Sequence, residues 1–267
     1  MDFTFIQKQT TCQRAFTLIE LLVVITIIGL LGTALSVSVQ SGYKQARQAN
    51  CKSNLKQFGI ALMIYRGEHD NVTPDWISNL YPDYVDDRGL YVCRADSNKG
   101  KSSPRPETLV RRAQARNDTD TAPFWDNAKN SDSTRNQTIQ CCSYLYEFSH
   151  ATAPGSWWGS VNWPQNQKPT GKLTMGQYKL AQMQYGDSSS KSSTGVILPY
   201  SASRIPIIRC YHHWDDEVIL GYNSGSASRE SKQFVTINVA YAGNVFVGPL
   251  YWEKTIYPGE QTSSSGQ

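Results

Sequence analysis

One unbroken apolar segment near the N-terminus restricts what this 267-residue chain can be. Residues 16–39 read FTLIELLVVITIIGLLGTALSVSV and contain a single charged side chain, that of Glu20. As an α-helix this segment would extend about 36 Å, which exceeds the ~30 Å hydrocarbon core of a bilayer. It is also longer than the apolar core of an ordinary secretory signal, and no small-x-small cleavage site follows it. We therefore predict a single membrane-spanning helix.

The charges around this segment predict its orientation. Residues 1–15 form a polar leader that carries Lys8 and Arg14. Basic residues before a span favour a cytoplasmic N-terminus, so the rest of the chain is expected in the periplasm or on the cell surface. The formal net charge is +4, but much of the basic excess lies in a Ser- and Asn-rich stretch that is typical of a solvated loop. A nucleic-acid partner is therefore not expected.

Glu20 needs a partner if the segment is buried in lipid. A carboxylate five residues into a membrane span costs a few kcal/mol on insertion scales. One interpretation is that Glu20 lies close enough to the helix end to reach the headgroups. The other is that it pairs with a cation from outside the helix, because pairing relieves the desolvation of both charges.

The string RAFTLIE (residues 14–20), followed by LLVVITIIGLL, resembles the N-terminal signature of type IV pilins and type II secretion pseudopilins. The resemblance implies that a prepilin peptidase cuts before Phe16 and N-methylates the new terminus. It also implies that Glu20 pairs with the terminal amine of a neighbouring subunit. The family usually has Gly immediately before the cut, whereas this chain has Ala15, the next smallest side chain. With Ala15 in this place, cleavage is expected to occur, but more slowly than with Gly.

The helix is predicted to continue to about residue 65. An apolar stripe recurs at alternating spacings of four and three, which is helical periodicity: Cys51, Leu55, Phe58, Leu62 and Tyr65. The segments at 51–65, 209–216 and 237–249 resemble a large pilin-like family abundant in planctomycete and verrucomicrobial bacteria. Ala242-Gly243 replaces the Asp-Gly of that family's closing motif.

The remaining sequence predicts β-structure with long loops, and so an α+β fold in which the long helix packs on an antiparallel sheet. Gly243-Asn244 is expected at a hairpin turn. Short strands bounded by Gly, Pro, Asn and Ser are predicted over residues 139–148, 196–198, 205–210, 217–222, 234–240 and 244–247. The predicted divisions are a cleaved leader (1–15), a spanning or filament-core helix (16–39), its amphipathic continuation (40–66), a globular domain (67–258) and a flexible tail (259–267).

Five cysteines remain once the leader is removed. Cys93 and Cys210 both flank predicted strands and are the candidate disulfide, although sequence alone does not determine connectivity. Cys51 lies on the apolar stripe and is expected to be a buried free thiol.

A metal or other cofactor is not expected. His212 and His213 are adjacent, and neighbouring side chains on a strand point to opposite faces, which argues against both binding one ion. The resemblance to pseudopilins suggests calcium as the alternative, since the major ones use a loop calcium. Its candidate ligands are Asp215, Asp216 and Glu217.

No enzyme is expected, since the sequence has no nucleophile elbow, P-loop or dinucleotide fingerprint. The leading hypothesis is a structural subunit of a type IV pilus or secretion pseudopilus, anchored in the bacterial inner membrane. Its partners would be prepilin peptidase and other pilin subunits. The alternative is an anchored binding domain for glycans or a surface polymer that does not polymerise. Its aromatic platform would come from Trp157, Trp158, Trp163, Trp214 and Trp252, for which a place in the core is the competing interpretation.

Overall fold

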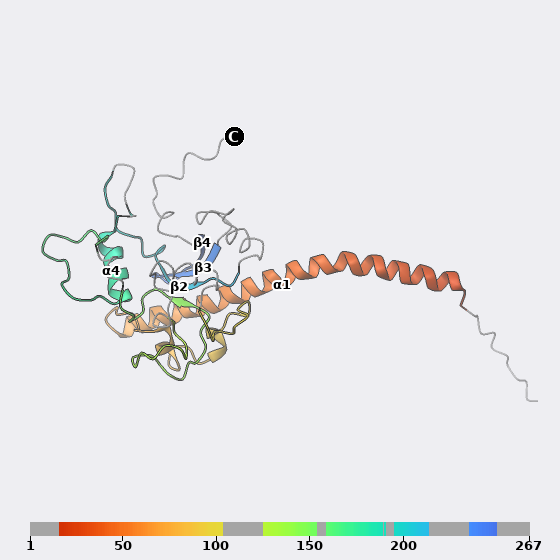
Figure 1. Ribbon diagram of the computed structural model, residues 1–267, viewed down its shortest axis with the longest axis horizontal. Helices are drawn as coiled ribbons and strands as arrows, with labels where there is room; N and C mark the ends of the chain where they lie inside the picture. The colour runs from red at the N-terminus through yellow and green to blue at the C-terminus, as the bar shows by residue number, and fades with distance from the viewer. Residues whose placement is uncertain are drawn as a thin grey trace, which may run out of the picture. The chain divides into compact units, whose positions relative to one another are not determined.

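A computed structural model describes residues 16–103, 125–153, 159–188, 190, 195–213 and 235–249. Within them the fold is α+β, as predicted. The elements are α1 (Leu18–Glu68), η1 (Ile77–Leu80), η2 (Arg88–Tyr91), β1 (Leu145–Tyr146), α4 (Met175–Tyr185), β2 (Pro206–Cys210), β3 (Val235–Ala240) and β4 (Val245–Pro249) (Figure 1). The chain divides into two units, Met1–Gln45 and Ala46–Gln267. Residues 46–66 of the predicted amphipathic continuation thus belong to the second unit, and residues 40–45 belong to the first.

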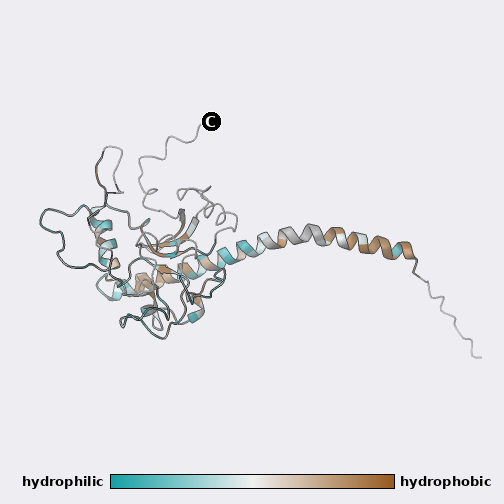
Figure 2. Cartoon of the chain, viewed as in Figure 1, coloured by the Kyte–Doolittle hydropathy of each residue, from teal (hydrophilic) through white to brown (hydrophobic). Residues whose placement is uncertain are grey.

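The first unit contains the N-terminal part of α1. Its large apolar side chains from Leu18 to Leu31 are all exposed, by fractions between 47% and 85%, and Figure 2 shows them as a nearly continuous apolar run. Among the residues that the structure describes, no helix combines the length and apolarity needed to cross a membrane. The predicted span at 16–39 includes residues 33–38, which are helical but whose side chains lie outside the description.

The second unit is built around the stripe on the C-terminal part of α1. Cys51, Leu55, Phe58 and Leu62 are at most 2% exposed, and Tyr65 packs against the same core, as the periodicity predicted. Phe58 meets the ring of Tyr91 edge-on, with centroids 4.9 Å apart. The stripe therefore forms one wall of the main core, and the sheet supplies another through residues that include Ile207, Ile208, Ile237 and Val239.

The sheet has four antiparallel strands in the order β1-β2-β3-β4. The predicted strands at 205–210, 234–240 and 244–247 are confirmed as β2, β3 and β4. The hairpin turn is also confirmed: Gly243 has φ +86° and its N–H donates to the Ala240 carbonyl at 2.8 Å.

Other strand predictions fared less well. The one at 139–148 shrinks to Leu145–Tyr146, and residues 196–198 contain a single bridge residue, Ile197, instead of a strand. The Leu198 N–H donates to the Ser190 carbonyl. The predicted strand at 217–222 lies outside the described residues.

Helix α4 was not predicted. It begins with a capping box, in which Thr174 accepts from the Gln177 N–H while the Gln177 side chain accepts from the Thr174 N–H, and it ends at Gly186 with φ +71°. Its buried face forms a second apolar cluster with Trp76 and Val161. Trp163 is partly buried and packs against this cluster, which favours the core interpretation for this tryptophan. The other four tryptophans of the glycan hypothesis lie outside the described residues.

Candidate functional site

The predicted processing segment lies at the start of α1. Phe16 is 80% exposed, and Ala15 lies outside the described residues. Thr17 and Glu20 form a reciprocal capping box: the Thr17 N–H and hydroxyl both donate to Glu20 Oε2 at 2.8 Å, and the Glu20 N–H donates to Thr17 Oγ1 at 3.3 Å. Glu20 therefore has a local role that neither sequence interpretation included. The Thr-x-x-Glu spacing was the signal for it.

This capping box positions the carboxylate relative to the predicted new terminus. Both donated bonds reach the same oxygen, Oε2, and both come from Thr17, the residue next to Phe16. A carboxylate held over the first helical turn also stabilises the exposed N–H groups and the positive end of the helix dipole. The start of α1 is thus ordered around Glu20.

A second group of chemically active side chains gathers in the globular unit. Cys51 comes from α1, Cys93 follows η2, Cys210 ends β2 and His213 lies in the turn after β2. Their three sulfurs and one imidazole nitrogen all lie within 4.8 Å of one another. Cys93 Sγ is 3.4 Å from His213 Nε2. The three thiols are at most 1% exposed and His213 is half-buried. We call these four residues the Cys3His cluster.

The predicted disulfide between Cys93 and Cys210 is not present: both are free, as is Cys51. The prediction placed two cysteines near each other but could not include the third, because packing of α1 on the sheet brings Cys51 to the same point. The prediction that Cys51 is a buried free thiol is confirmed.

The surroundings shift the pKa values of the three thiols in different directions. Hydrogen bonds from Cys210 and Cys51, assisted by His213, hold the pKa of Cys93 well below the usual thiol range despite burial. Burial raises the pKa of Cys210 well above its ordinary value. For Cys51, a hydrogen bond with Cys210 lowers the pKa, but a bond with Cys93 and burial outweigh it. These neighbouring groups favour the thiolate form more at Cys93, beside His213, than at Cys51 or Cys210.

His212 has surroundings different from those of its neighbour. Its Nε2 lies 3.1 Å from the Ser143 carbonyl and 3.7 Å from Asp96 Oδ2, and burial lowers its pKa. Asp96 in turn accepts from Ser143 Oγ at 2.7 Å and from the Gly100 N–H at 2.7 Å. Only His213 of the two adjacent histidines belongs to the cluster.

Sequence reasoning missed the cluster as a unit. The local signal was the short spacing Cys210-x-x-His213 at the end of a strand. The other two members, Cys51 and Cys93, are distant in sequence. The calcium candidates Asp215, Asp216 and Glu217 lie outside the described residues.

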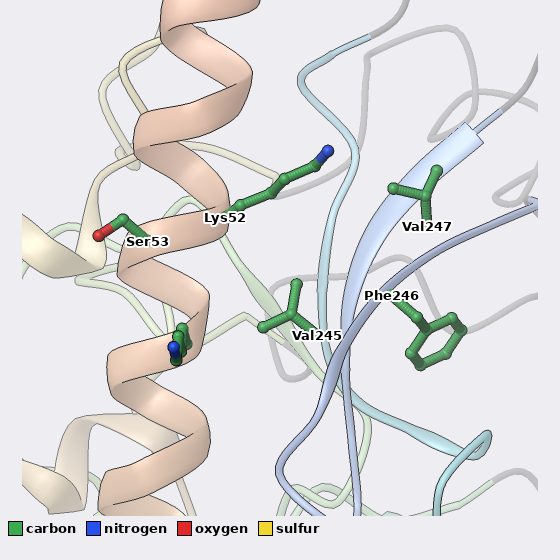
Figure 3. A pocket seen from close by; sticks show the side chains of 6 residues that line it. Lys52, Ser53, Val245, Phe246 and Val247 are labelled. Carbon is green, nitrogen blue, oxygen red and sulfur yellow. The ribbon is translucent and has the colours of Figure 1, made fainter.

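A groove of about 440 Å³ lies between α1 and β4. Lys52, Ser53 and Lys56 line its helix side, and Val245, Phe246 and Val247 line its strand side. Figure 3 shows Lys52 extending from the helix across from the two valines. The groove thus has a basic side and an apolar side. None of its lining residues is acidic, and the Ser53 side chain is the one hydroxyl among them.

Comparison with known families identifies the N-terminal segment. Residues 10–36 match the family model described as the prokaryotic N-terminal methylation motif, which is consistent with a type IV pilin-like protein. This motif supports a pilin- or pseudopilin-type subunit and suggests membrane anchoring. The match does not reach the segments that resemble the planctomycete and verrucomicrobial family. Comparisons with curated proteins and with solved structures gave no match.

Proposed function

We propose that this chain is a structural subunit of a pilus or secretion pseudopilus, cut by prepilin peptidase before Phe16. The observation that carries the proposal is the methylation motif over residues 10–36, placed directly at the start of a long helix with exposed apolar side chains. A helix that is apolar on all sides needs a lipid or protein environment around it. The membrane provides that environment before assembly, and neighbouring helices provide it in a filament.

Glu20 directs assembly in this proposal. Removal of the leader creates an ammonium on Phe16, next to the residue that already bonds the Glu20 carboxylate. Within an apolar bundle, an unpaired ammonium and an unpaired carboxylate would each lose hydration, so pairing between subunits fixes the axial register. The capping box keeps the carboxylate at the helix start until that partner arrives.

The first test is the identity of the mature N-terminus. We expect co-expression with a prepilin peptidase to yield a chain that begins at N-methylated Phe16, identified by mass spectrometry, and shear to release filaments. Ala15→Gly should be cut at least as fast as wild type. A chain that still begins at Met1 in the presence of active peptidase would refute the proposal. Methylated Phe16 without filaments would favour the non-polymerising binder.

Two variants separate pairing from capping at Glu20. Glu20→Gln keeps an oxygen that can accept from Thr17 but removes the charge, whereas Thr17→Ala removes the cap and keeps the charge. The proposal expects filaments to be lost in Glu20→Gln and retained in Thr17→Ala, with both proteins still in the membrane fraction. The reverse pattern would assign Glu20 a capping role only.

A further inference from the structure

We propose that Cys51, Cys93, Cys210 and His213 bind a zinc ion that fastens helix α1 to the sheet and to the loop after η2. The site is independent of processing and assembly at the N-terminus, because all four residues belong to the unit Ala46–Gln267.

The four ligand atoms would need to move only slightly toward one another to bind a zinc ion. Tetrahedral zinc, with Zn–S near 2.3 Å and Zn–N near 2.0 Å, separates its sulfur ligands by about 3.8 Å and a sulfur from a nitrogen by about 3.5 Å. The four ligand atoms already lie within 4.8 Å of one another, and Cys93 Sγ and His213 Nε2 are 3.4 Å apart. The cluster therefore needs to contract by about 1 Å at most.

The chemistry of the donors selects the metal. Calcium and magnesium take oxygen ligands, and the cluster offers none. Three thiolates and one imidazole in a compact arrangement form a Cys3His set, which is typical of structural zinc. All four coordination positions would come from the protein, and the three sulfurs are buried. A closed site of this kind leaves no position for a substrate, so its role is structural.

Groups around the cluster support the ligands. The Tyr144 hydroxyl lies next to Cys51 and lowers the pKa of that thiol, and Asn54 Nδ2 donates to the Tyr144 hydroxyl at 3.5 Å. Tyr144 is fully buried and packs edge-on against Phe58, so its hydroxyl is held in place. Such outer hydrogen bonds orient metal ligands and are a regular part of metal sites.

The connectivity shows what the ion would contribute. The ligands come from the middle of α1, from the loop after η2 and from the end of β2, so one ion joins segments that are far apart in the sequence. Such cross-links restrict the unfolded chain most when the loops they close are long. The five cysteines that the structure describes form no disulfide that could do the same.

The first test is metal content in matched variants of the full-length protein, purified in detergent without chelator. We expect about one zinc per chain by mass spectrometry of the metal. Cys93→Ser and His213→Ala should lose most of it, and His213→Cys should retain it. Cys142→Ala removes an equally buried thiol outside the cluster, and His212→Ala removes the adjacent histidine. Both controls should keep wild-type zinc.

A second measurement uses wild-type protein alone, in case the variants fail to fold. After removal of metal by a chelator under reducing conditions, Co²⁺ should produce the visible bands of a tetrahedral cobalt thiolate, and Zn²⁺ should abolish them. Zinc should also raise the melting temperature of the metal-free protein.

Three results would overturn the proposal. One is wild-type protein with neither zinc nor a cobalt-thiolate spectrum. Another is full zinc content in both Cys93→Ser and His213→Ala. The third is a native disulfide between any two of Cys51, Cys93 and Cys210, detected by peptide mapping without reductant.

Discussion

Glu147 lies between two buried cations, Arg209 of β2 and Lys179 of α4. Its Oε1 lies 3.2 Å from Arg209 Nη1 and its Oε2 lies 3.5 Å from Lys179 Nζ. All three residues are at most 7% exposed. Arg209 also donates to Asn238 at 3.2 Å and to Thr236 at 3.4 Å. One carboxylate thus compensates charge that comes from both β2 and α4.

Glu147→Gln should lower the free energy of unfolding by about 3–5 kcal/mol, because it removes the buried negative charge that lies 3.2 Å from Arg209 and 3.5 Å from Lys179. Chemical denaturation monitored by circular dichroism would measure the loss. The control is Asp83→Asn at an exposed acid, where the change should stay within about 0.5 kcal/mol. Equal, small effects in both variants would show that Glu147 does not hold the network together.

At the scale of elements, α1 meets the β3–β4 turn at a point with no room for a side chain. A Cβ on Gly59 would lie 2.5 Å from the Gly243 carbonyl oxygen and 3.2 Å from Val239 Cγ1. Two turns further on, Arg66 Nη1 donates to the Tyr241 carbonyl at 2.6 Å, and its guanidinium lies 3.7 Å from the centre of the Tyr241 ring. Helix and turn are therefore fitted closely to each other.

Gly59→Ala should reduce the free energy of unfolding by about 1–3 kcal/mol, since overpacking against backbone outweighs the better helix propensity of alanine. Gly67→Ala is the matched control. Gly67 lies in the same helix with nothing within 4 Å of its Cβ position, so alanine should stabilise by up to about 1 kcal/mol. Thermal unfolding of the two variants against wild type checks the difference in sign.

Local signals accounted for the elements that sequence predicted. The apolar block and the stripe ending at Tyr65 give α1, and Gly243-Asn244 gives the hairpin, because neighbouring residues determine both. The Cys3His cluster depends instead on tertiary packing, which places Cys51 beside two cysteines far along the chain. Helix α4 had a readable Thr174–Gln177 capping signal, but its short, mixed-polarity sequence has weak periodicity.

At the scale of the whole molecule, the boundary between the two units falls inside α1. The second unit begins at Ala46, and the main core includes the buried stripe of the helix as well as the sheet. A domain defined from residue 67 onward would lose Cys51, Leu55, Phe58 and Leu62 from that core. The globular part is therefore complete only with the second half of the helix.

A chain that begins at Ala46 should be soluble and unfold cooperatively, whereas one that begins at Gly67 should not. The shorter chain loses one wall of the core, and deleting single large side chains there already costs about 2–5 kcal/mol each. Near-ultraviolet circular dichroism and a thermal melt of both fragments make the comparison. Cooperative melting of the Gly67 fragment would contradict the assignment of residues 46–66 to the domain.

The contact at Gly59 also has a mechanical meaning. Sliding α1 by one turn, about 5.4 Å, would bring Leu55 or Met63 to the place where even a methyl group does not fit. The close contact between Gly59 and the β3–β4 turn therefore opposes sliding of the helix along its axis. A pull along the helix axis would then be resisted as shear across a rigid, close-packed contact rather than dissipated by slippage. In the filament proposed above, this contact and the buried stripe of α1 would transmit tension from the helix to the globular unit.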